Sequence, residues 1–268
     1  MQLIIPALNE QNRLPSTLRA LRAYALSTAE LPLPPLEVLV VDNGSTDRTV
    51  EVALSMDSPV MPVRVLHCEE RGKGAAVRAG MAATTSDVVG FMDADGATDL
   101  RAFESAAVCL DAGADVVIGS RSVNGSQIED RHDWMRRTGA AAYRKAAAIL
   151  VPGIRDTQCG FKILRGDLAR DVFASVATSG FSFDVELLAR CCALKARVEE
   201  IPVIWADVPG STFSPLRHGI RSFADLIGIA WRVRQTPTVR TATVTALRPR
   251  ALTDETAVVT PLTLVGGA

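Results

Sequence analysis

Segments typical of buried strands alternate with helical patterns along the first half of the chain, and this alternation constrains the fold more than any single motif. Strand-like composition, rich in Val, Ile and Leu, occurs at residues 2–5, 37–41, 63–67, 88–92 and 115–119. The first of these strands is expected to break at Pro6. Helical patterns lie at residues 14–26, 49–53, 73–81 and 100–112. This alternation of strands and helices predicts an α/β fold with a mainly parallel sheet flanked by helices. In such folds ligands bind at the carboxyl ends of the strands.

Polar and acidic residues follow three of the predicted strands. Asn9 and Glu10 come after the first strand, the turn 42–47 begins with Asp42 after the second, and Asp93 follows the fourth. Because the carboxyl ends of parallel strands meet at one edge of a sheet, these side chains are expected to form a single site.

Two carboxylates, Asp93 and Asp95, stand two residues apart directly after the strand 88–92, and Asp99 follows four residues on. Carboxylates at this spacing can present oxygens to one Mg²⁺ or Mn²⁺ ion that is shared with a diphosphate. The same residues also suit a solvated turn that caps a helix, because Asp and Gly are common in turns and N-caps. The triplet by itself leaves both readings open.

A glycine-rich turn, residues 69–74, opens an alanine-rich helix. Glycine allows the backbone to approach a ligand closely and a helix N-terminus favours anions, so Lys73 or its backbone can face a phosphate. The turn is not a Walker A loop, since no Gly-Lys-Ser/Thr ends it. A flexible solvated turn before a surface helix is the alternative.

The second half of the chain is less regular. Residues 123–137 are polar and charged and predict a mobile loop, in which Arg131 can receive an anionic group, before a helix at 138–150. Residues 154–164 predict a compact polar turn between a helix and a strand. Residues 181–192 predict an amphipathic helix, whose early acids Asp184 and Glu186 either complement the helix dipole or belong to a site.

The C-terminal part combines an edge strand with a basic helix. Pro202 places the predicted strand 201–206 near an edge of the sheet. From residue 216 to 234 apolar side chains recur at helical spacing among several arginines. Such a helix can lie on an anionic membrane surface, pack on its own domain or contact a second subunit in a homodimer. Beyond residue 234 no period is evident, so residues 1–234 are expected to form one domain and 235–268 a loosely ordered tail.

Composition restricts the partners and the compartment. The 268 residues carry a formal net charge of −1, which argues against a general nucleic-acid binder. The five cysteines have no paired metal-type spacing, and the N-terminus has no signal-peptide pattern, so a cytoplasmic protein is expected. No run of 18 apolar residues occurs that would span a membrane.

Seven segments taken together resemble the family 2 glycosyltransferases of GT-A fold, a Rossmann-like nucleotide-diphospho-sugar transferase fold. Within that family the likeness is greatest to the dolichyl-phosphate β-glucosyltransferase and polyprenyl-phosphate hexosyltransferase group. The segments lie at residues 5–10, 40–47, 72–81, 93–99, 119–121, 156–162 and 183–188, in the order of the family. The resemblance implies an inverting hexosyltransferase that uses a nucleotide sugar, with UDP-glucose favoured, and Mg²⁺ or Mn²⁺.

The resemblance also assigns roles to individual positions. Those that match nucleotide-sugar-binding residues are Pro6, Ala7, Asn9, Glu10, Asp42, Lys73, Asp93, Ala94 and Asp95. Asp93 and Asp95 match the metal-binding D-x-D pair, with Asp95 as the more direct ligand. Asp156 matches the candidate base, and Asp184 is the second candidate for a catalytic carboxylate.

The acceptor that the resemblance implies is a polyprenyl or dolichyl phosphate. Such a phosphate is already anionic near neutral pH, so Asp156 either acts as a base or positions another group. Arg121 and Arg131 would then hold the phosphate. Asn43 stands where many relatives have a second Asp, and the membrane segments of many lipid-directed members are missing. The helix 215–234 therefore either attaches the protein peripherally to the inner face of the membrane, or the acceptor is a soluble small molecule such as a secondary metabolite.

Two other classes of protein fit the sequence less well. Nucleotidyltransferases that make nucleotide sugars carry a glycine-rich basic loop after the first strand, and residues 6–10 are not such a loop. A noncatalytic sugar-nucleotide binding module is the alternative of another class, and the joint presence of Asp93, Asp95 and Asp156 disfavours it.

Overall fold

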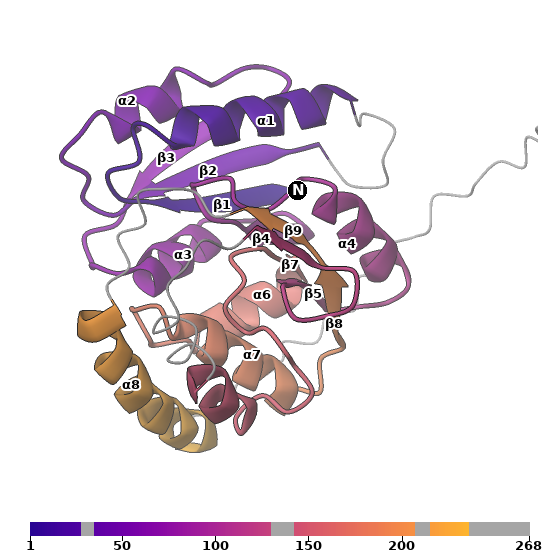
Figure 1. Ribbon diagram of the computed structural model, residues 1–268. Coiled ribbons are helices and arrows are strands. Elements are labelled where there is room, and N and C mark those ends of the chain that lie inside the picture. The colour runs from indigo at the N-terminus through magenta and orange to yellow at the C-terminus, as the bar shows by residue number, and fades with distance from the viewer. Residues whose placement is uncertain (28–34, 130–141, 207–214, 236–268) are drawn as a thin grey trace, which may run out of the picture.

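A seven-stranded sheet forms the centre of the protein (Figure 1). The computed structural model describes residues 1–27, 35–129, 142–206 and 215–235. In spatial order the strands are β3 (Val63–His67), β2 (Glu37–Asp42), β1 (Gln2–Ala7), β4 (Val88–Phe91), β7 (Lys162–Arg165), β5 (Val116–Ser120) and β8 (Val198–Pro202). Neighbouring strands are parallel except at β7, which runs antiparallel to both β4 and β5. The predicted mainly parallel sheet is therefore confirmed.

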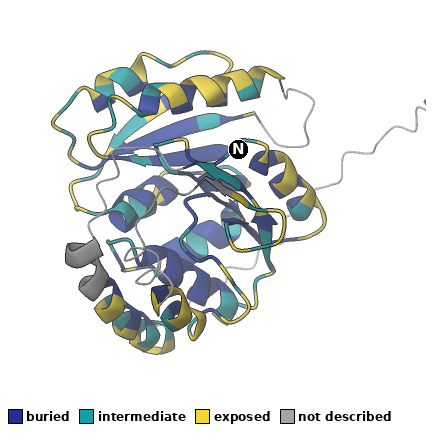
Figure 2. Cartoon of the chain, in the orientation of Figure 1, coloured by how far each residue is buried: buried dark blue, intermediate teal, exposed yellow. Residues whose placement is uncertain are grey.

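Helices cover both faces of this sheet (Figure 1). One face packs against α1 (Leu14–Ser27), α2 (Thr49–Leu54) and α4 (Ala102–Asp111), and the other against α3 (Lys73–Ala82), α6 (Gly166–Phe173) and α7 (Phe183–Ala193). Figure 2 shows that the inner strands of the sheet and the inward sides of these helices are buried, whereas the edge strands β3 and β8 are partly exposed.

The alternation of side chains along each strand produces the two cores. In β1, Leu3 and Ile5 join the cluster that contains α1, whereas Ile4 joins the cluster that contains α3. All three side chains are fully buried. Burial of each contributes roughly 1.5–3 kcal/mol relative to an exposed side chain.

The expected break of the first strand at Pro6 is wrong, because β1 continues through Pro6 to Ala7. The carbonyl of Ile4 accepts a hydrogen bond from Met92 of the segment after β4, and pairing with β4 ends at Ile4. The backbone polar groups of residues two apart in a strand point to the same edge. The Pro6 nitrogen therefore points toward β4, as the Ile4 carbonyl does, at a position where pairing with β4 has already ended. The missing N–H therefore costs no ladder hydrogen bond.

Two strands lie where turns or loops were expected. Residues 162–164, predicted as part of a polar turn, belong to β7. Residues 127–129, predicted as part of a mobile loop, form β6 (Gln127–Glu129), which pairs in parallel with β9 (Ile204–Ala206). The predicted strand 201–206 is thus divided between β8, which confirms the expected sheet edge, and β9. These short strands are specified by distant partners rather than by local composition.

Helix α7 is not amphipathic as predicted. Every residue from Phe183 to Cys191 is buried, including Asp184 and Glu186. α7 packs between α3, α6 and α8 (Pro215–Gln235) and has no solvent-facing stripe over this span. The two acids have buried ion-pair partners, so complementing the helix dipole is not their main role.

The C-terminal helix α8 has two apolar faces instead of one. Leu226 and Ile229 are buried against Tyr143 of the helical segment 142–148 and Val185 of α7. A second set at helical spacing, Phe223, Ile227 and Trp231, is 39%, 77% and 64% exposed. The predicted helix is confirmed; of its described side chains, Ile227 and Trp231 face outward, whereas the Phe223 ring packs edge-on against Tyr143.

Two expectations cannot be compared with the fold. The first part of the predicted helix 138–150 and the tail 236–268 lie outside the described residues. Among the residues that are described, no helix combines the length and the apolar character needed to cross a bilayer.

Candidate functional site

The carboxyl ends of β1, β2 and β4 lie side by side, as predicted, because these strands are adjacent and parallel. Ala7 is in register with Asp42, so the loop after β1 lies beside the loop after β2. Ala7 is buried and Pro6 is half-buried. The sheet thus brings together the polar segments that the sequence placed after separate strands.

Hydrogen bonds join the first two of these loops. Asn9 adopts a left-handed conformation (φ 57°), which asparagine tolerates better than most residues. Its backbone N–H donates to Ser45 Oγ at 3.0 Å, and its Oδ1 accepts from the Thr46 N–H at 2.8 Å. Asp42 accepts from the Ser45 N–H at 3.1 Å and lies 3.2 Å from His67 Nδ1. Asn9 and Asp42 are therefore held in one small network.

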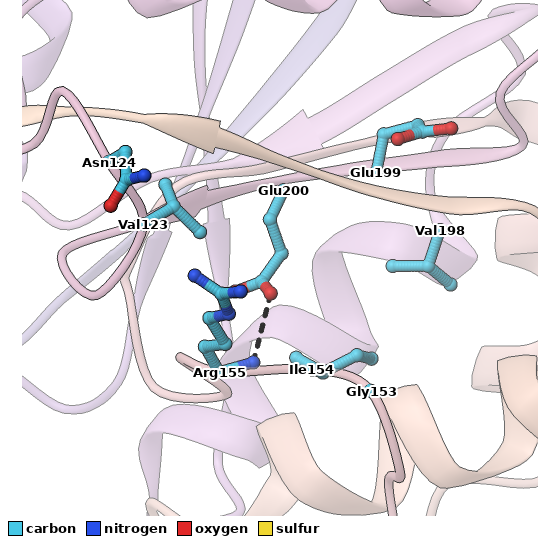
Figure 3. A pocket seen from close by; sticks show the side chains of 8 residues that line it. All are labelled: Val123, Asn124, Gly153, Ile154, Arg155, Val198, Glu199 and Glu200. Carbon is cyan, nitrogen blue, oxygen red and sulfur yellow. Dashed lines mark hydrogen bonds between the residues drawn. The ribbon is translucent and has the colours of Figure 1, made fainter.

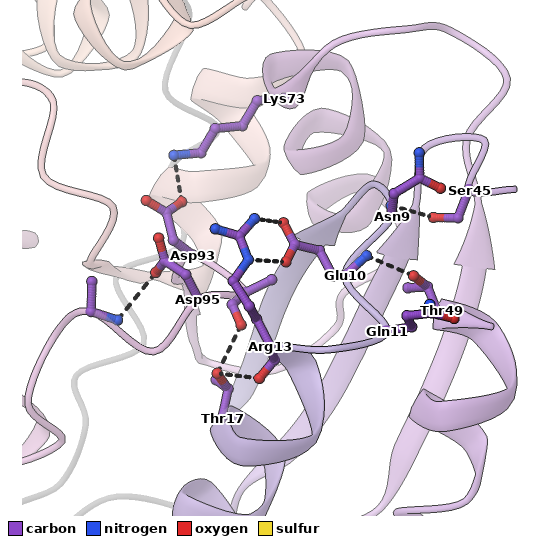
Figure 4. Close-up of polar contacts among 12 residues, drawn as sticks. Asn9, Glu10, Gln11, Arg13, Thr17, Ser45, Thr49, Lys73, Asp93 and Asp95 are labelled. Atoms are coloured by element: carbon purple, nitrogen blue, oxygen red, sulfur yellow. Dashed lines mark hydrogen bonds and ion pairs between the residues drawn. The ribbon is translucent and has the colours of Figure 1, made fainter. Parts of the chain in front are cut away.

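Glu10 lies between this network and the carboxylates after β4 (Figure 4). Arg13 donates to both oxygens of Glu10, at 2.7 and 2.5 Å. Burial raises the pKa of Glu10, Arg13 partly offsets this effect, and the charges of Asp95 and Asp93 raise the pKa further. Glu10, Asp93 and Asp95 are thus close enough to repel one another electrostatically.

Asp93 pairs with Lys73, whose ammonium lies 2.5 Å from Asp93 Oδ1 (Figure 4). Burial by itself would raise the pKa of Asp93, but Lys73, Lys162 and Arg121 bring this pKa below its ordinary value. Burial likewise lowers the pKa of Lys73, and Asp93 and Asp184 more than reverse the change. Both groups are therefore charged at neutral pH.

Asp95 has a different environment. Its Oδ1 accepts from the Ala97 N–H at 3.1 Å, and burial followed by the charge of Asp93 raises its pKa. The turn is fixed to α1, because Thr17 Oγ1 donates to the Ala94 carbonyl at 2.7 Å. Asp95 is thus a partly buried carboxylate and, among the described residues, has no cationic side chain as close as Lys73 is to Asp93.

Asp99 does not share this site. Its carboxylate accepts from the backbone N–H of Arg101 at 2.8 Å and pairs with the Arg101 guanidinium at 3.0 Å, just before α4. For this third acid, the interpretation as a turn and cap residue applies.

Asp93 and Asp95 fit a divalent cation that completes its ligands with substrate oxygens. In the described part of the chain, no group of three or more His, Cys, Asp or Glu side chains is placed to bind a metal ion. Mg²⁺ is commonly held by one or two carboxylates together with substrate phosphates. Burial and, after it, the charge of Asp93 raise the pKa of Asp95, and a bound cation would favour the charged form of this carboxylate.

A second charged pair lies at the end of β5. Arg121 donates from Nε to Asp156 Oδ2 at 2.7 Å and from a terminal nitrogen to Oδ1 at 3.0 Å, and its backbone N–H also bonds Oδ2. Burial raises the pKa of Asp156, but Arg121 brings it below its usual range. The Arg121 guanidinium also lies 5.5 Å from the Trp205 ring centroid. Asp156 is 2% exposed at its side chain, and its lone pairs are largely occupied.

Lys162 and Asp184 form a third pair beneath these groups, with Lys162 Nζ 2.6 Å from Asp184 Oδ1. The two side chains are 0% and 3% exposed. Burial raises the pKa of Asp184, and Lys162 and Lys73 partly lower it. Asp184, predicted as the second candidate for a catalytic carboxylate, therefore interacts electrostatically with Lys73 of the site but is closed off from solvent.

The glycine-rich turn before α3 serves packing as well as the position of Lys73. Gly72 has φ 127°, and a Cβ at this residue would collide with the Ser179 carbonyl. A Cβ at Gly74 would collide with Thr178 and Phe183. The backbone was expected to approach a ligand closely at these glycines. In the structure, both glycines instead approach the segment that leads into α7.

Asn43 has a role that its side-chain amide explains. Its Nδ2 donates to the carbonyls of Cys68 and Glu70 at 3.2 and 2.7 Å, and its Oδ1 accepts from the Gly72 N–H at 2.7 Å. A carboxylate could not donate to these carbonyls. Asn43 therefore fixes the loop between β3 and α3.

A hollow of about 390 Å³ lies along the edge strand β8 (Figure 3). Its lining residues are Val123, Asn124, Gly153, Ile154, Arg155, Val198, Glu199 and Glu200. Glu200 accepts from the backbone N–H groups of Arg155 and Asp156 at 2.9 and 3.0 Å. The hollow thus adjoins the Asp156 turn but contains none of the predicted site residues.

Several residues that shape the site were not predicted. Arg13 binds Glu10, and Thr17 binds the Ala94 carbonyl. Glu200 accepts a hydrogen bond from the backbone N–H of Asp156. Lys162 lies within a segment that resembles the family, which was its one signal in the sequence. Arg131, a predicted phosphate-binding residue, lies outside the described residues.

Comparison with known proteins identifies the family of this chain. Residues 2–173 match the family model described as glycosyl transferase family 2. The chain belongs to this family. Among its curated relatives, the dolichyl-phosphate beta-glucosyltransferase of Drosophila melanogaster is 36% identical over 251 residues, which cover 87% of this chain and 77% of the relative. The corresponding protein of Homo sapiens is 31% identical over 254 residues, covering 88% and 78%.

Solved structures show that this family 2 glycosyltransferase has the GT-A fold. Glucosyl-3-phosphoglycerate synthase of Mycobacterium tuberculosis superposes with a TM-score of 0.62 at 20% identity, covering 86% of this chain and 79% of that one. The same enzyme in complex with Mn²⁺, UDP and glucosyl-3-phosphoglycerate gives a TM-score of 0.59 at 19% identity, covering 86% and 78%. At this identity the likeness establishes the shared fold.

Proposed function

We propose that this glycosyltransferase moves glucose from UDP-glucose to a polyprenyl or dolichyl phosphate, with residues 1–234 acting as one catalytic domain. The bond between the glucose C1 and the UDP oxygen breaks, a bond from C1 to an acceptor phosphate oxygen forms, and the configuration at C1 is inverted. The observation that carries the proposal is the carboxylate pair Asp93 and Asp95, with Lys73 bound to Asp93 and the charge of Arg121 near enough to lower the pKa of Asp93, in a chain similar to dolichyl-phosphate glucosyltransferases.

The donor end of the site is proposed to be the network along β1 and β2. Asn9, Asp42 and the adjoining loops, with Pro6 and Ala7, would contact the base and ribose, and Glu10 would border the ribose. Lys73 would interact with the diphosphate, since it is a charged ammonium beside Asp93 and is 16% exposed. An opposite charge at this position stabilises a departing diphosphate.

A Mg²⁺ or Mn²⁺ ion is proposed to bind Asp93 and Asp95. When bound, such an ion supplies Lewis-acid stabilisation of charge on the leaving UDP. This proposal is supported by the burial of Asp95 beside the charge of Asp93, which together raise the pKa of Asp95, and by the Mn²⁺ in the complex of the tuberculosis synthase. Lys73 neutralises Asp93 before any substrate binds.

The acceptor phosphate is proposed to bind near Arg121, with Arg131 as a second candidate. Asp156 holds both ends of the Arg121 guanidinium fork and has a lowered pKa, which suits a positioning group better than a proton acceptor. A phosphate near neutral pH is already a nucleophile and needs little help from a base. We therefore assign Asp156 to the orientation of Arg121.

Contact with a membrane surface is proposed to occur through the outward face of α8. Ile227 and Trp231 are exposed along this helix, and Phe223 borders them with its ring packed edge-on against Tyr143. The helix contains four arginines and one aspartate. Arg232 binds Glu186 and Thr178, and the remaining basic excess suits anionic lipids and opposes pairing with a second copy of the helix. A cytoplasmic protein that docks on the inner face of a membrane in this way could reach a lipid phosphate there.

The decisive experiment measures UDP release from UDP-glucose with Mn²⁺ or Mg²⁺, with and without a short-chain polyprenyl phosphate. Turnover is expected only with the lipid phosphate and the metal, and GDP-glucose is expected to be a poorer donor. The matching polyprenol without a phosphate and a soluble phosphorylated acid serve as acceptor controls. Turnover with the soluble acid and none with the lipid would contradict the proposed acceptor.

A pair of variants tests the acceptor end. Arg121→Met is expected to raise the KM for the lipid phosphate at least tenfold. Arg101→Met removes an exposed arginine at the start of α4 and is expected to leave that KM unchanged. Equal KM values in the two variants would exclude Arg121 from phosphate binding.

A further inference from the structure

Lys162 is a fully buried ammonium whose hydrogen-bonding capacity is used up within the protein. Its Nζ donates to the carbonyls of Thr157 and Cys159 at 3.1 and 2.7 Å and to Asp184 at 2.6 Å. An ammonium group has three protons, so each has a partner. Since Lys162 and Asp184 are at most 3% exposed, neither can touch a substrate in this structure.

The two carbonyls that Lys162 binds belong to the turn 157–161, which connects the two ends of the site. On one side, Gly160 packs so tightly against Asp93 that a Cβ at Gly160 would collide with the carboxylate. On the other side, the turn begins directly after Asp156, which holds Arg121. Lys162 itself starts β7 and is in register with Phe91 of β4 and Ile118 of β5.

This arrangement is rigid because its base is the central sheet. β4 leads directly to Asp93, β5 leads to Arg121, and β7 lies between them. A buried ion pair often gives no more stability than apolar side chains of similar volume. The use of an ammonium here is therefore better explained by geometry, since an apolar side chain could not bind two carbonyls at once.

We propose that the buried Lys162–Asp184 pair is a positioning device that holds the turn 157–161 between Asp93 and Arg121, and so sets the donor and acceptor ends of the site together. Lys162 acts through the carbonyls of the turn, and Asp184 neutralises and orients Lys162. The assignment of a donor end and an acceptor end rests on the proposed function. The contacts of the turn with Asp93 and Asp156 do not depend on it. Asp184 thus changes from a candidate catalytic residue to a positioning residue.

The test compares Lys162→Met with Arg190→Met. Methionine keeps most of the volume of lysine and removes the charge and the three hydrogen bonds. Arg190 belongs to another buried ion pair, with Glu186 one turn away in α7, and is 2% exposed at its side chain. Lys162→Met removes the ion-pair partner of buried Asp184, whereas Glu186 keeps Arg232 at 3.3 Å in Arg190→Met, so Lys162→Met is expected to lose at least as much stability as Arg190→Met.

The first measurement needs no substrate. Hydrogen exchange of the peptide that covers residues 155–163 is expected to become at least tenfold faster in Lys162→Met than in the wild type, below the melting temperature of the variant. In Arg190→Met the same peptide is expected to exchange at the wild-type rate. Equal exchange rates of this peptide in the two variants would overturn the proposal, whatever reaction the enzyme catalyses.

The second measurement addresses both ends of the site. Lys162→Met is expected to weaken Mn²⁺-dependent UDP binding and to raise the KM for polyprenyl phosphate, each about tenfold, while Arg190→Met changes both less than twofold. An effect at one end alone would overturn the proposed link. If the wild type binds no UDP, the proposed function fails, and the exchange result still decides on the turn.

A further variant covers the case in which Lys162→Met does not fold. Gly160→Ala places a methyl group against Asp93 and leaves the Lys162–Asp184 pair in place. It is expected to weaken Mn²⁺-dependent UDP binding about tenfold. Wild-type binding in Gly160→Ala would show that the turn does not constrain Asp93 and would refute the proposal.

Discussion

Substitution of Asp156 by Asn separates a positioning carboxylate from a catalytic base. Asn keeps the size of Asp and one acceptor oxygen, but it replaces the charge and places an NH₂ group against the Arg121 guanidinium. Asp156 accepts three hydrogen bonds from Arg121 and is 2% exposed at its side chain. Removal of one partner from a buried ion pair costs about 3–5 kcal/mol.

The expected loss lies below that range because Arg121 is 28% exposed and can be partly solvated. We expect Asp156→Asn to lower the free energy of unfolding by about 2–3 kcal/mol at neutral pH. For a domain of this size that corresponds to a decrease in Tm of roughly 5–10 °C. Urea denaturation provides the measurement, with the exposed Asp111→Asn as the control.

The pH dependence has a defined sign. The pKa of Asp156 in the folded protein lies below its ordinary value of 3.8. Its charged form therefore stabilises the protein above pH 3.8, and this contribution is lost as the pH falls through the lower folded pKa. The difference in unfolding free energy between wild type and Asp156→Asn should be largest near neutral pH and decrease below pH 3.8.

Kinetics then distinguish the two roles. A positioning role predicts that Asp156→Asn raises the KM for the lipid phosphate about tenfold, and that Arg121→Met adds little to this loss in the double variant. A base would instead contribute about 10²–10⁴-fold to kcat. Wild-type stability in Asp156→Asn, or full additivity with Arg121→Met, would refute the assignment.

Three further predictions concern other parts of the protein. Asp95→Asn is expected to abolish Mn²⁺-dependent UDP binding and to raise Tm by a few degrees at neutral pH. The pKa of Asp95 is raised in the folded protein, so its charged form destabilises the fold above pH 3.8 and the neutral Asn does not. Thermal shift with and without Mn²⁺ and UDP checks both effects. Asn43→Asp is expected to lower the free energy of unfolding by about 2 kcal/mol in a denaturation experiment, because a carboxylate would face two backbone carbonyls. The double variant Ile227→Ser and Trp231→Ser is expected to lose binding to anionic liposomes in a sedimentation assay and to keep the wild-type Tm, since both side chains are exposed; unchanged liposome binding would contradict the membrane contact.

Local patterns predicted the regular parts of the fold well. The strands 37–42 and 63–67 and the helix α8 follow from runs of β-branched residues and from helical spacing, which need no knowledge of distant contacts. The gathering of Asn9, Asp42 and Asp93 at one edge also followed from the sequence. It required only that successive strands be parallel, which the alternation of strands and helices indicates.

Residues close together in the chain therefore specify the α/β class, the parallel strands around β1 and the edge at which the acids meet. Contacts between distant segments place β7 between β4 and β5, join Arg121 to Asp156 across 35 positions and join Lys162 to Asp184 across 22. These contacts also select the apolar face of α8 that is buried. The physical reason is that an isolated charge or a short apolar segment has no preferred partner locally, so its burial and its ion pair are fixed by the packing of elements that are distant in sequence.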